Sequence, residues 1–391
     1  MCAHKKQKIV LNCLKYFNFL IAFKVYNNIK INLIEMITIK DIAREAQVSE
    51  GTVDRVIHNR GGVSKNTELK IRTILKRHNF SVNPVASALA MKNKHFIATL
   101  IPEHNAFDLF WKSPYLGILK AAEDVKNLGV QVSNFTFNQY NTNSYLNTFN
   151  TLLKSKPTAV IMVPNFSKET KQIVAKLELL GIPYLFLNID IKGFNNLAFV
   201  GQNSYMAGYI AGKLMHLNKP TSSHFLIIQA RYNITKNNAV SRRIKGFNDY
   251  FLKNNIDSKI QNLKIENLNN SSETKRQINS YLDEHSENVG VFVPSSRIYI
   301  VVNCLEDNYL KKLELIGFDN TPQNIECLKQ DSVSYLISQK PFHQGYEAIR
   351  LITDYITTKK CIPNNKIYLP IEILIKENVD YTERNTAVFD N

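Results

Sequence analysis

The chain has 391 residues, of which 44% are hydrophobic and 21% are charged, with 14 glycines and 12 prolines, and this composition excludes a disordered or fibrous protein. Its 49 lysines and arginines exceed its 33 acidic residues and give a net charge of +16, so a polyanionic partner is expected, nucleic acid before an anionic membrane. The length exceeds what one hydrophobic core usually organises, so two or three folding units are expected.

The cysteines lack the pattern of a disulfide framework or a zinc site. Their number is odd, they lie far apart, and none forms a C-x-x-C pair. We therefore expect no metal and no cofactor. No run of about 18 apolar residues is uninterrupted, so no membrane helix is expected. The cysteines are Cys2, Cys13, Cys304, Cys327 and Cys361.

We interpret residues 1–35 as a non-native or disordered extension, with Met36 as the true initiator. The segment is rich in Lys, Asn and Ile, and its apolar run from Ile9 to Tyr26 is interrupted by polar residues such as Lys15. Lysines precede that run, as they do in a signal peptide, but no small-residue cleavage site follows it. We exclude this segment from the fold.

Residues 36–82 are predicted to form three short helices around one small core. Thr38, Ser49 and Ser64 carry hydroxyls that can cap the three helix starts. A tight break separates the first two helices, and a Gly61-Gly62 turn precedes the third. Two short helices joined so tightly resemble a helix-turn-helix. The faces expected to pack together are Ile39, Ile42, Ala43 and Ala46 on the first helix, Val53, Val56 and Ile57 on the second, and Ile71, Ile74, Leu75 and His78 on the third.

In a helix-turn-helix, the second helix lies in the major groove with its first residues on base edges. Arg55 is our candidate for reading a base, because a guanidinium pairs bidentately with guanine and discriminates by about 1 to 3 kcal/mol. Lys40 and Thr52 are expected to contact phosphates. Residues 36–94 carry a surplus of +6, which a small helical bundle with a solvated basic face could also carry. The DNA-binding candidates in the head are Lys40, Ser49, Glu50, Gly51, Thr52, Asp54, Arg55 and Asn59.

The order of these residues resembles the DNA-binding head of the lac repressor (LacI) family. The matching run is Ile39-Lys-Asp-Ile-Ala-Arg-Glu-Ala-Gln-Val-Ser49, followed by Thr52-Val53 and Arg55-Val56. The resemblance implies a dimer on a palindromic operator, with Glu50 and Gly51 at the positions that select the operator. Asp54 stands where most relatives carry serine, so no relative's operator can be carried over. Glycine within a helix also costs about 1 kcal/mol against alanine.

Residues 83–94 are predicted to form a hinge helix of about two turns and a linker. Asn83 can cap this helix, which is too short to be stable without a partner. In the resembled family the hinge helix pairs with its dimer mate in the minor groove. Leu89 falls at the position that wedges between base steps, and small Ala86 permits close approach. The alternative is an ordinary linker in which Leu89 merely packs.

From residue 95 to residue 380, short apolar runs alternate with amphipathic stretches, which indicates parallel α/β sheets covered by helices. We predict two doubly wound lobes, followed by a tail of residues 381–391. Lobe 1 comprises about 95–196 and 341–365, and lobe 2 about 197–340 and 366–380. The runs that predict lobe 1 are Phe96–Ile101, Tyr115–Leu128, Val130–Phe135, Asn143–Lys154, Ala159–Val163, Lys168–Leu180 and Tyr184–Leu187, and those that predict lobe 2 begin with Ala198–Val200 and continue with Phe225–Ile228, Gly290–Val293 and Leu315–Gly317.

Ligands of such sheets bind outside the carboxyl ends of the strands, and two facing lobes create a cleft there. The polar residues that directly follow apolar runs are therefore site candidates. Enzyme signatures such as G-x-G-x-x-G, a Walker loop, G-x-S-x-G and paired metal ligands are missing from the sequence. We therefore do not expect an enzyme. The candidates at strand ends are Glu103, Asn188, Asp190, Ser295, Arg297 and Asp319.

The body resembles the periplasmic-binding-protein-like effector domain of the same family, which is related to ribose-binding proteins. The resemblance implies that Arg243 and Asp319 bind sugar hydroxyls, that Gln339 adds a polar contact, and that Phe110 or Trp111 stacks on the sugar ring. Trp111 could instead be core, and Arg243 a surface ion pair. The matching segments are Phe110-Trp111 with Gly117-Ile118, Val200-Gly201-Gln202 with Ala207-Gly208, Arg243-Ile-Lys-Gly-Phe247, Ile316-Gly-Phe-Asp319 and Gln339-Lys-Pro with Gly345.

These expectations combine into a cytoplasmic, homodimeric repressor of transcription. A small sugar-like effector between the lobes would change their relative angle, reorder the hinge helices and so alter operator affinity. The family often has an Asn-Asp pair where this chain has Ser295-Ser296, which leaves the effector open. One alternative is a sugar-processing enzyme with a basic head, for which Glu103, Asp190 and Asp319 are the available carboxylates. The other is a transport-type sugar-binding protein, which would require export.

Overall fold

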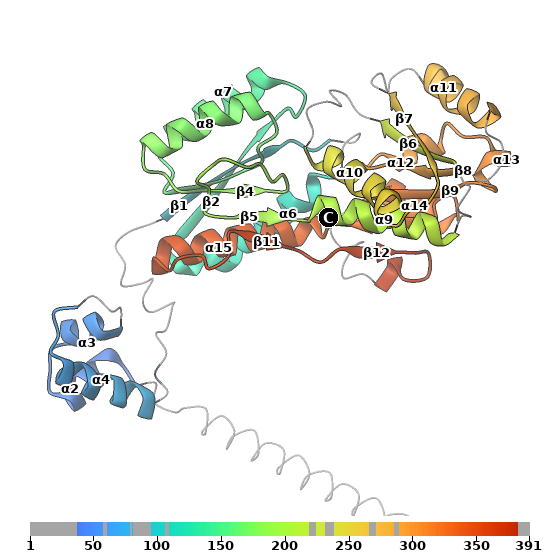
Figure 1. The fold of residues 1–391 in the computed structure, drawn as a ribbon. Helices are drawn as coiled ribbons and strands as arrows, with labels where there is room; N and C mark the ends of the chain where they lie inside the picture. Colours follow the sequence, from blue (N-terminus) through green and yellow to red (C-terminus); the bar gives the residue numbers. More distant parts are fainter. Residues whose placement is uncertain are drawn as a thin grey trace, which may run out of the picture. The chain divides into compact units, whose positions relative to one another are not determined.

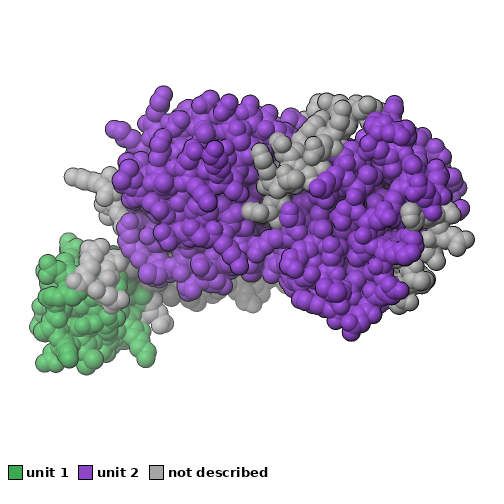
Figure 2. Space-filling view, turned by 45° about the horizontal axis from the view of Figure 1, so that its top comes forward, with its two compact units in different colours: residues 1–84 green, residues 85–391 purple. Residues whose placement is uncertain are grey.

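The computed structural model describes residues 37–57, 61–78, 80, 95–105, 109–218, 224–230, 238–265, 271–284 and 289–381. The chain forms two compact units, residues 1–84 and residues 85–391, which Figure 2 draws in green and purple. Below we call them the head and the body. The extension 1–35, the hinge 83–94 and the candidates Asn59, Ala86 and Leu89 lie outside the described residues.

The head is a bundle of three helices that begin where the sequence predicts. Thr38 and Asp41 form a capping box at the start of the first helix, in which each side chain accepts a backbone N–H of the other residue. Ser49 Oγ accepts the backbone N–H of Thr52 at 3.2 Å, and Ser64 Oγ accepts that of Thr67 at 3.2 Å. The helices are α2 (Ile39–Ala46), α3 (Glu50–Ile57) and α4 (Lys65–Arg77).

The apolar faces of these helices share one core. The buried residues are Ile42, Ala43, Ala46, Val53, Val56, Ile71 and Ile74, all of which the helical periodicity predicts. One polar tie supports the packing. Glu45 on α2 accepts hydrogen bonds from Arg77 Nη1 and His78 Nε2, each at 2.8 Å, and so holds α2 to the end of α4. The head is therefore a small folding unit with its own core.

Lobe 1 of the body is a six-stranded sheet with helices on both faces (Figure 1). One face packs on α6 and α15 through a core that includes Ile118 and Ile352. The other packs on α7 and α8 through a core that includes Phe149 and Ile173. In sheet order the strands are β11 (Lys366–Tyr368), β5 (Phe199–Gly201), β4 (Tyr184–Leu187), β3 (Ala159–Met162), β1 (His95–Pro102) and β2 (Val130–Phe137), and the helices are α6 (Lys112–Val125), η1 (Lys126–Leu128), α7 (Thr142–Lys154), α8 (Ser167–Leu179) and α15 (Pro341–Thr358).

Lobe 2 repeats this arrangement. Helices α9 and α10 cover one face of a second six-stranded sheet through a core with Phe247 and Phe292, and α11, α12 and α14 contribute to the core on the other face. Figure 1 shows α9 and α10 side by side. The strands are β12 (Glu372–Leu374), β10 (Tyr335–Ser338), β9 (Glu314–Phe318), β8 (Val289–Phe292), β6 (His224–Ala230) and β7 (Lys259–Ile265), and the helices are α9 (Ser204–Asn218), α10 (Asn238–Lys253), α11 (Ser271–Glu284), α12 (Ile298–Val302), α13 (Asp307–Leu310), α14 (Pro322–Lys329) and η3 (Val379–Tyr381).

The boundary between the lobes differs from the prediction at two strands. We expected the run Ala198–Val200 to begin lobe 2, but β5 pairs with β4 in the first sheet, with Phe199 opposite Phe186. Likewise β11 joins the first sheet beside β5, whereas residues 366–380 were assigned to lobe 2. A strand of three residues carries too little pattern to indicate which sheet it joins. The chain consequently crosses between the lobes after β5, after β10 and after β11.

Among the described residues, none of the helices combines the length and apolar character that crossing a membrane requires. Within the same residues, His, Cys, Asp and Glu side chains nowhere gather in threes as a metal site would need.

Candidate functional site

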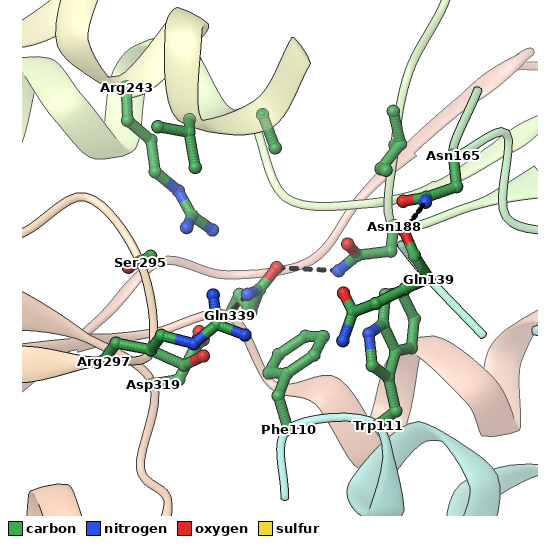
Figure 3. Close-up of a pocket in the computed structure, with 14 residues that line it drawn as sticks. Phe110, Trp111, Gln139, Asn165, Asn188, Arg243, Ser295, Arg297, Asp319 and Gln339 are labelled. Carbon is green, nitrogen blue, oxygen red and sulfur yellow. Dashed lines mark hydrogen bonds between the residues drawn. The ribbon is translucent and has the colours of Figure 1, made fainter. Parts of the chain in front are cut away.

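A cavity of about 60 Å³ lies where the carboxyl ends of the strands of both lobes meet. Figure 3 shows Gln339 near its middle, with Arg243 and Arg297 reaching in from lobe 2 and the rings of Phe110 and Trp111 from lobe 1. Of the effector-binding candidates, the structure brings together Phe110, Trp111, Asn188, Arg243, Ser295, Arg297, Asp319 and Gln339, and only Asp190 is not on the cavity wall.

The aromatic wall consists of two consecutive residues just before α6. The rings of Phe110 and Trp111 meet edge to face, with centroids 5.0 Å apart and planes at 81°. Both side chains also belong to the core of lobe 1, and Trp111 is only 5% exposed. The two interpretations of Trp111, as core and as cavity wall, therefore hold together, because one face of the ring pair can pack inward while the other borders the cavity.

Arg243 on α10 is buried, so it does not lie at the surface as the alternative of a surface ion pair would require. It is 4% exposed, and its guanidinium carbon lies 3.8 Å from the centre of the Phe318 ring. Its Nη1 donates a hydrogen bond to the Pro294 carbonyl at 3.0 Å. Stacking on a ring and bonding to a carbonyl hold the planar group at the cavity, where its fork of donors can face a ligand.

Arg297 connects the two lobes across the cavity. It directly follows the loop after β8 in lobe 2, and its Nη2 donates a short hydrogen bond to the hydroxyl of Tyr140, which follows β2 in lobe 1. The guanidinium carbon lies 5.9 Å from the centre of the Tyr140 ring. Arg297 is 8% exposed and Tyr140 is half-buried, so this contact is partly shielded from water.

A chain of amide hydrogen bonds forms a second connection between the lobes. Asp319 Oδ1 accepts from Gln339 Nε2 at 2.7 Å, and Gln339 Oε1 accepts from Asn188 Nδ2 at 2.9 Å. Asn188 Nδ2 also donates to Gln344 Oε1 on α15 at 2.9 Å. Asp319 belongs to lobe 2 and Asn188 to lobe 1, with Gln339 on the crossing segment between them, so ligand contacts with any of these groups affect both lobes.

The backbone at this network is left-handed at several residues that are not glycine. Asn188 has φ of 65°, Asp319 has φ of 69° and Lys340 has φ of 53°. Asn and Asp tolerate this region better than other residues with a side chain. Hydrogen bonds hold these residues in place, since Asp319 N donates to Ile337 O at 3.0 Å and Asn188 N donates to Val200 O at 2.9 Å. Backbone strain of this kind gathers at functional sites.

Asn324 on α14 holds together two loops on the lobe 2 side of the cavity. Its side chain is fully buried, and its Nδ2 donates to the carbonyls of Ser296, Phe318 and Asp319 at 3.0, 2.9 and 3.0 Å. One amide therefore joins the loop after β8 to the turn after β9. Sequence reasoning did not single out Asn324, because it lies within a helix and does not follow a strand.

Asp190 and Glu103 do not reach the cavity. Asp190 accepts hydrogen bonds from Lys366 Nζ at 2.8 Å and from Arg242 Nη1 at 3.1 Å, and so lies in an ion-pair cluster outside it. Burial alone raises the pKa of Asp190, but the hydrogen bonds and charges of Lys366 and Arg242 outweigh it and hold the pKa below its usual value. Glu103 is exposed. Only Asp319 remains as a carboxylate at the cavity among the described lining residues.

The cavity also has walls that the sequence analysis missed. Gln139 and Asn165 follow β2 and β3, and Asn165 Nδ2 donates to the Gln139 carbonyl at 2.7 Å. The rule that nominated Asn188 would have found both, had it been applied to these two strands. Nothing in the pattern indicated the apolar contacts from α10. The missed lining residues are Gln139, Asn165, Ile189, Ala239, Val240 and Ser296.

In the head, the described candidates for DNA contact lie at the start of α3, apart from Lys40, which lies in the first turn of α2. Lys40, Ser49, Glu50, Gly51 and Arg55 are exposed, whereas Thr52 and Asp54 are half-buried. The hydroxyls of Ser49 and Thr52 lie 2.9 Å apart and bond to each other. The turn and cap thus orient the first residues of α3 outward, as a reading helix requires.

Comparison with known proteins identifies both units. Residues 97–360 match the model of the periplasmic binding protein domain, and residues 38–83 match that of the bacterial regulatory proteins of the lacI family. The catabolite control protein A of Priestia megaterium is 23% identical over 350 residues, which cover 88% of this chain and 99% of that protein. The ribose operon repressor of Lactococcus lactis is 24% identical over 353 residues, with 88% and 98% covered.

A solved structure gives the same result for the fold. A crystal structure described as a LacI transcriptional regulator from Bacteroides fragilis superposes with a TM-score of 0.66 at 28% identity, covering 74% of this chain and all of that one. The matched order, a regulatory head followed by a two-lobed body, is the order that the sequence analysis predicted.

Proposed function

Since this chain belongs to the lacI family of bacterial regulatory proteins, with a periplasmic binding protein domain as its body, we propose that it binds a palindromic operator as a homodimer. In this proposal a sugar-like effector that binds in the cavity raises or lowers the affinity for the operator. Like the relatives named above, the chain is a transcriptional regulator and not an enzyme. A regulator of this kind acts in the cytoplasm, which we propose as its location.

The observation that carries the proposal is the cavity itself. It lies between two lobes of a body that is joined in one chain to a helix-turn-helix head. Aromatic rings from lobe 1 and guanidinium and carboxylate groups from lobe 2 are the side chains that bind the apolar and hydroxyl faces of a sugar. That the L. lactis relative is named for a ribose operon also favours a sugar.

Signalling in this proposal uses the connections between the lobes. An effector that contacts Arg297 or Gln339 competes with, or adds to, hydrogen bonds that already join lobe 1 to lobe 2. It therefore binds the open and closed arrangements with different affinity, which is what allosteric control requires. The proposed hinge helices of 83–94 would transmit the change in lobe angle to the operator. Leu89 would insert between base steps in the minor groove, and Ala86 would allow the two hinge helices of the dimer to approach closely.

Footprinting of the full chain on the promoter region of its own gene tests the operator claim. We expect a protected palindrome whose occupancy changes when candidate sugars are added. Arg55→Ala should relax base preference at one position of each half-site and weaken binding by about 1 to 3 kcal/mol. Protection that is absent under all conditions would remove the operator claim.

Arg72→Ala is the matched control for Arg55→Ala. It removes the same charge from the head, but Arg72 lies on α4, where its Nε donates to Glu68 Oε1 at 2.8 Å. We expect this variant to keep the sequence preference of the wild type. Equal loss of preference in both variants would show that charge alone, and not the reading of a base by Arg55, explains the binding.

A further inference from the structure

We propose that one edge of lobe 1 binds phosphates of the operator duplex, an inference that rests on the proposed operator binding by the head and hinge. It is the edge where the amino ends of the parallel strands lie, and we call it the basic edge. The segments that precede β2, β3, β4, β5 and β11 there contain five lysines, all exposed, and no acidic residue. The segments are 126–129, 154–158, 180–183, 195–198 and 359–365, and the lysines are Lys126, Lys154, Lys156, Lys359 and Lys360.

The first residue of β1, His95, lies among these segments. His95 N donates to Gly129 O at 3.0 Å, and Thr158 N donates to Phe96 O at 2.7 Å. Lys359 is also close, because its charge, after burial as the larger cause, lowers the pKa of His95. The three segments that carry all five lysines therefore meet where the chain enters the body.

The lysines of the basic edge are not neutralised by neighbouring carboxylates. In the described part of the chain, none of the five ammonium groups forms an ion pair. The acidic residues nearest to these segments along the chain, Asp124 and Glu178, have other partners. Asp124 accepts from Lys120 Nζ at 2.9 Å, and Glu178 accepts from the Tyr184 hydroxyl at 2.9 Å. The positive charge of the edge is therefore available to an external anion.

Lysines at helix ends can also offset the negative ends of helix dipoles, so lobe 2 provides a comparison. Its helices end at the corresponding edge, and the described segments before β7, β9 and β10 contain lysines too. Those segments also contain Asp257 and Asp331, however, and Lys329 at the end of α14 pairs with Asp380 at 2.6 Å. Helix ends alone therefore do not require a surface of unpaired lysines.

The length of the chain limits the distance between the basic edge and the DNA. In the proposed function Leu89 inserts between base steps of the minor groove, and His95 follows Leu89 by six residues. Six residues span at most about 20 Å. The groove is about 7.5 Å deep, so the phosphates on its rims lie nearer to the body than the base steps do. The lysines around His95 are therefore within reach of the phosphates next to the inserted leucine.

Lysine suits the phosphate backbone better than it suits base edges. Its ammonium is a compact charge on a flexible stem, so it can contact a phosphate without a fixed geometry. Such contacts add affinity that does not depend on the base sequence and that falls steeply with salt. The body thus adds affinity, while the head selects the operator.

The test measures how DNA affinity of the full-length protein depends on salt. The probe is the promoter duplex used for footprinting, and fluorescence anisotropy gives the affinity at about 50 to 200 mM potassium chloride. Lys154→Gln combined with Lys360→Gln removes two lysines from each protomer of the proposed homodimer. The slope of log affinity against log salt should become shallower by about 2 to 4, because each lost phosphate contact reduces it by about 0.9. At about 100 mM salt the affinity should fall at least about tenfold.

Lys168→Gln combined with Lys171→Gln is the matched control. Both lysines are exposed in the first turns of α8, at the opposite edge of the same sheet, and the variant removes the same charge from lobe 1. It should keep the slope of the wild type, because salt screens exposed charges beyond about 10 Å. Lys154→Arg combined with Lys360→Arg should also keep the slope.

A second pair guards against a variant that fails to fold. Lys126→Gln combined with Lys359→Asn should reduce the slope as the first pair does, and asparagine suits the left-handed backbone of Lys359, with φ of 56°. Thermal unfolding followed by circular dichroism checks the folding of each variant. Lysines that only stabilise helix ends would lower the melting temperature and leave the slope unchanged, which overturns the inference.

The outcomes separate this inference from the proposed function. Slopes equal to that of the wild type in both pairs overturn the inference, as does an equal decrease in the Lys168 and Lys171 variant. A protected palindrome would then leave the proposed function intact. If the wild type binds the duplex without protecting any sequence, the proposed operator is removed, and the slopes on the same duplex still decide whether the body contacts phosphates. A wild type that binds no DNA removes both.

Discussion

Lobe 1 and lobe 2 share a strand order but supply different chemistry to the cavity. The sheets run β11-β5-β4-β3-β1-β2 and β12-β10-β9-β8-β6-β7, so each strand of one lobe has a counterpart in the other. The edges that face the cavity have diverged. Lobe 1 contributes aromatic rings and amides, whereas lobe 2 contributes all the charged groups among the described lining residues.

Neither lobe alone therefore presents a complete site. The rings of lobe 1 can cover the apolar face of a ligand, whereas the guanidiniums and the carboxylate of lobe 2 can bind its polar groups. Ligand affinity should consequently depend on how readily the lobes close. The predictions below test this division, beginning with the charges of lobe 2.

The largest effect is expected from Asp319→Asn. Asparagine keeps the shape of the side chain and tolerates the left-handed backbone. It removes the one carboxylate among the described residues that line the cavity, and with it the charge that accepts a hydrogen bond from Gln339 beside two buried guanidiniums. Removing one charge from a buried cluster typically costs about 3 to 5 kcal/mol. The free energy of unfolding without ligand, from urea denaturation followed by circular dichroism, measures this cost.

Asp331→Asn is the control for this prediction. Asp331 also has a left-handed backbone, with φ of 57°, but its side chain is 69% exposed. We expect a change below about 1 kcal/mol, as for surface ion pairs in general. Equal losses in the two variants would show that the buried charge balance of lobe 2 contributes nothing special to stability.

The helix pairs of the two lobes provide a direct comparison. A Cβ on Gly208 of α9 would lie 1.9 Å from the Arg243 carbonyl oxygen, and one on Gly117 of α6 would lie 2.0 Å from that of Phe342. Gly208→Ala and Gly117→Ala should each cost about 1 to 3 kcal/mol, because a backbone must move. Only Gly208→Ala should also weaken ligand binding strongly, since the displaced backbone carries Arg243.

Gly51→Ala in α3 of the head is the control for the glycine variants. Only Ser49 Oγ lies within 4 Å of the added Cβ, at 3.9 Å. Alanine should therefore stabilise the head by up to about 1 kcal/mol through its higher helix propensity. Equal affinity for ligand in the Gly117→Ala and Gly208→Ala proteins, measured by calorimetry, would argue against lobe 2 as the source of the charged contacts.

The sequence predicted the local structure of this fold better than the pairing of its strands. The head was predictable helix by helix, because caps such as Thr38 and Ser64 and the apolar periodicity act locally. The alternation in the body predicted two doubly wound lobes for the same reason. The sheet that the three-residue strand Phe199–Gly201 joins was not predictable, because strand pairing depends on residues far apart in the sequence.

The candidate site was partly predictable for a related reason. Polar residues that follow strands, such as Asn188 and Asp319, meet at one edge because parallel strands end there together. Partners in three dimensions were not predictable. Asp190 follows the same strand as Asn188 but is held outside the cavity by Lys366, which lies 176 residues away in the sequence. Arg297 was nominated, but its contact with Tyr140 of lobe 1 was not.

Tyr140→Phe tests the contact between Arg297 and lobe 1. The variant removes the hydroxyl that accepts a hydrogen bond from Arg297 and keeps the ring. Loss of one hydrogen bond to a charged group should destabilise this arrangement of the two lobes by about 1.5 to 3 kcal/mol. Small-angle scattering without ligand should show a larger radius of gyration for the variant than for the wild type. Calorimetry should show that the variant binds the effector more weakly. An unchanged radius and affinity would mean that the amide network through Gln339 is sufficient to hold the lobes.

The smallest effect is expected from pH at Asp190, which joins Lys366 of lobe 1 to Arg242 of lobe 2. Burial raises the pKa of Asp190, but the two cations outweigh burial and lower the pKa below the ordinary value of 3.8. A carboxyl whose pKa is lower in the folded protein stabilises it above the ordinary value, and that stability is lost as the pH falls through the lowered pKa.

The contribution of this cluster should be about 1 kcal/mol at most, because Arg242 and Lys366 are 38% and 34% exposed and solvent screens their charges. Unfolding free energies measured from pH 6 to pH 3 should fall less steeply in Asp190→Asn than in the wild type. Identical slopes would show that the ion pairs of Asp190 do not stabilise the contact between lobe 1 and lobe 2. The connection between the lobes would then depend on the buried contacts at the cavity alone, where we propose that the ligand binds.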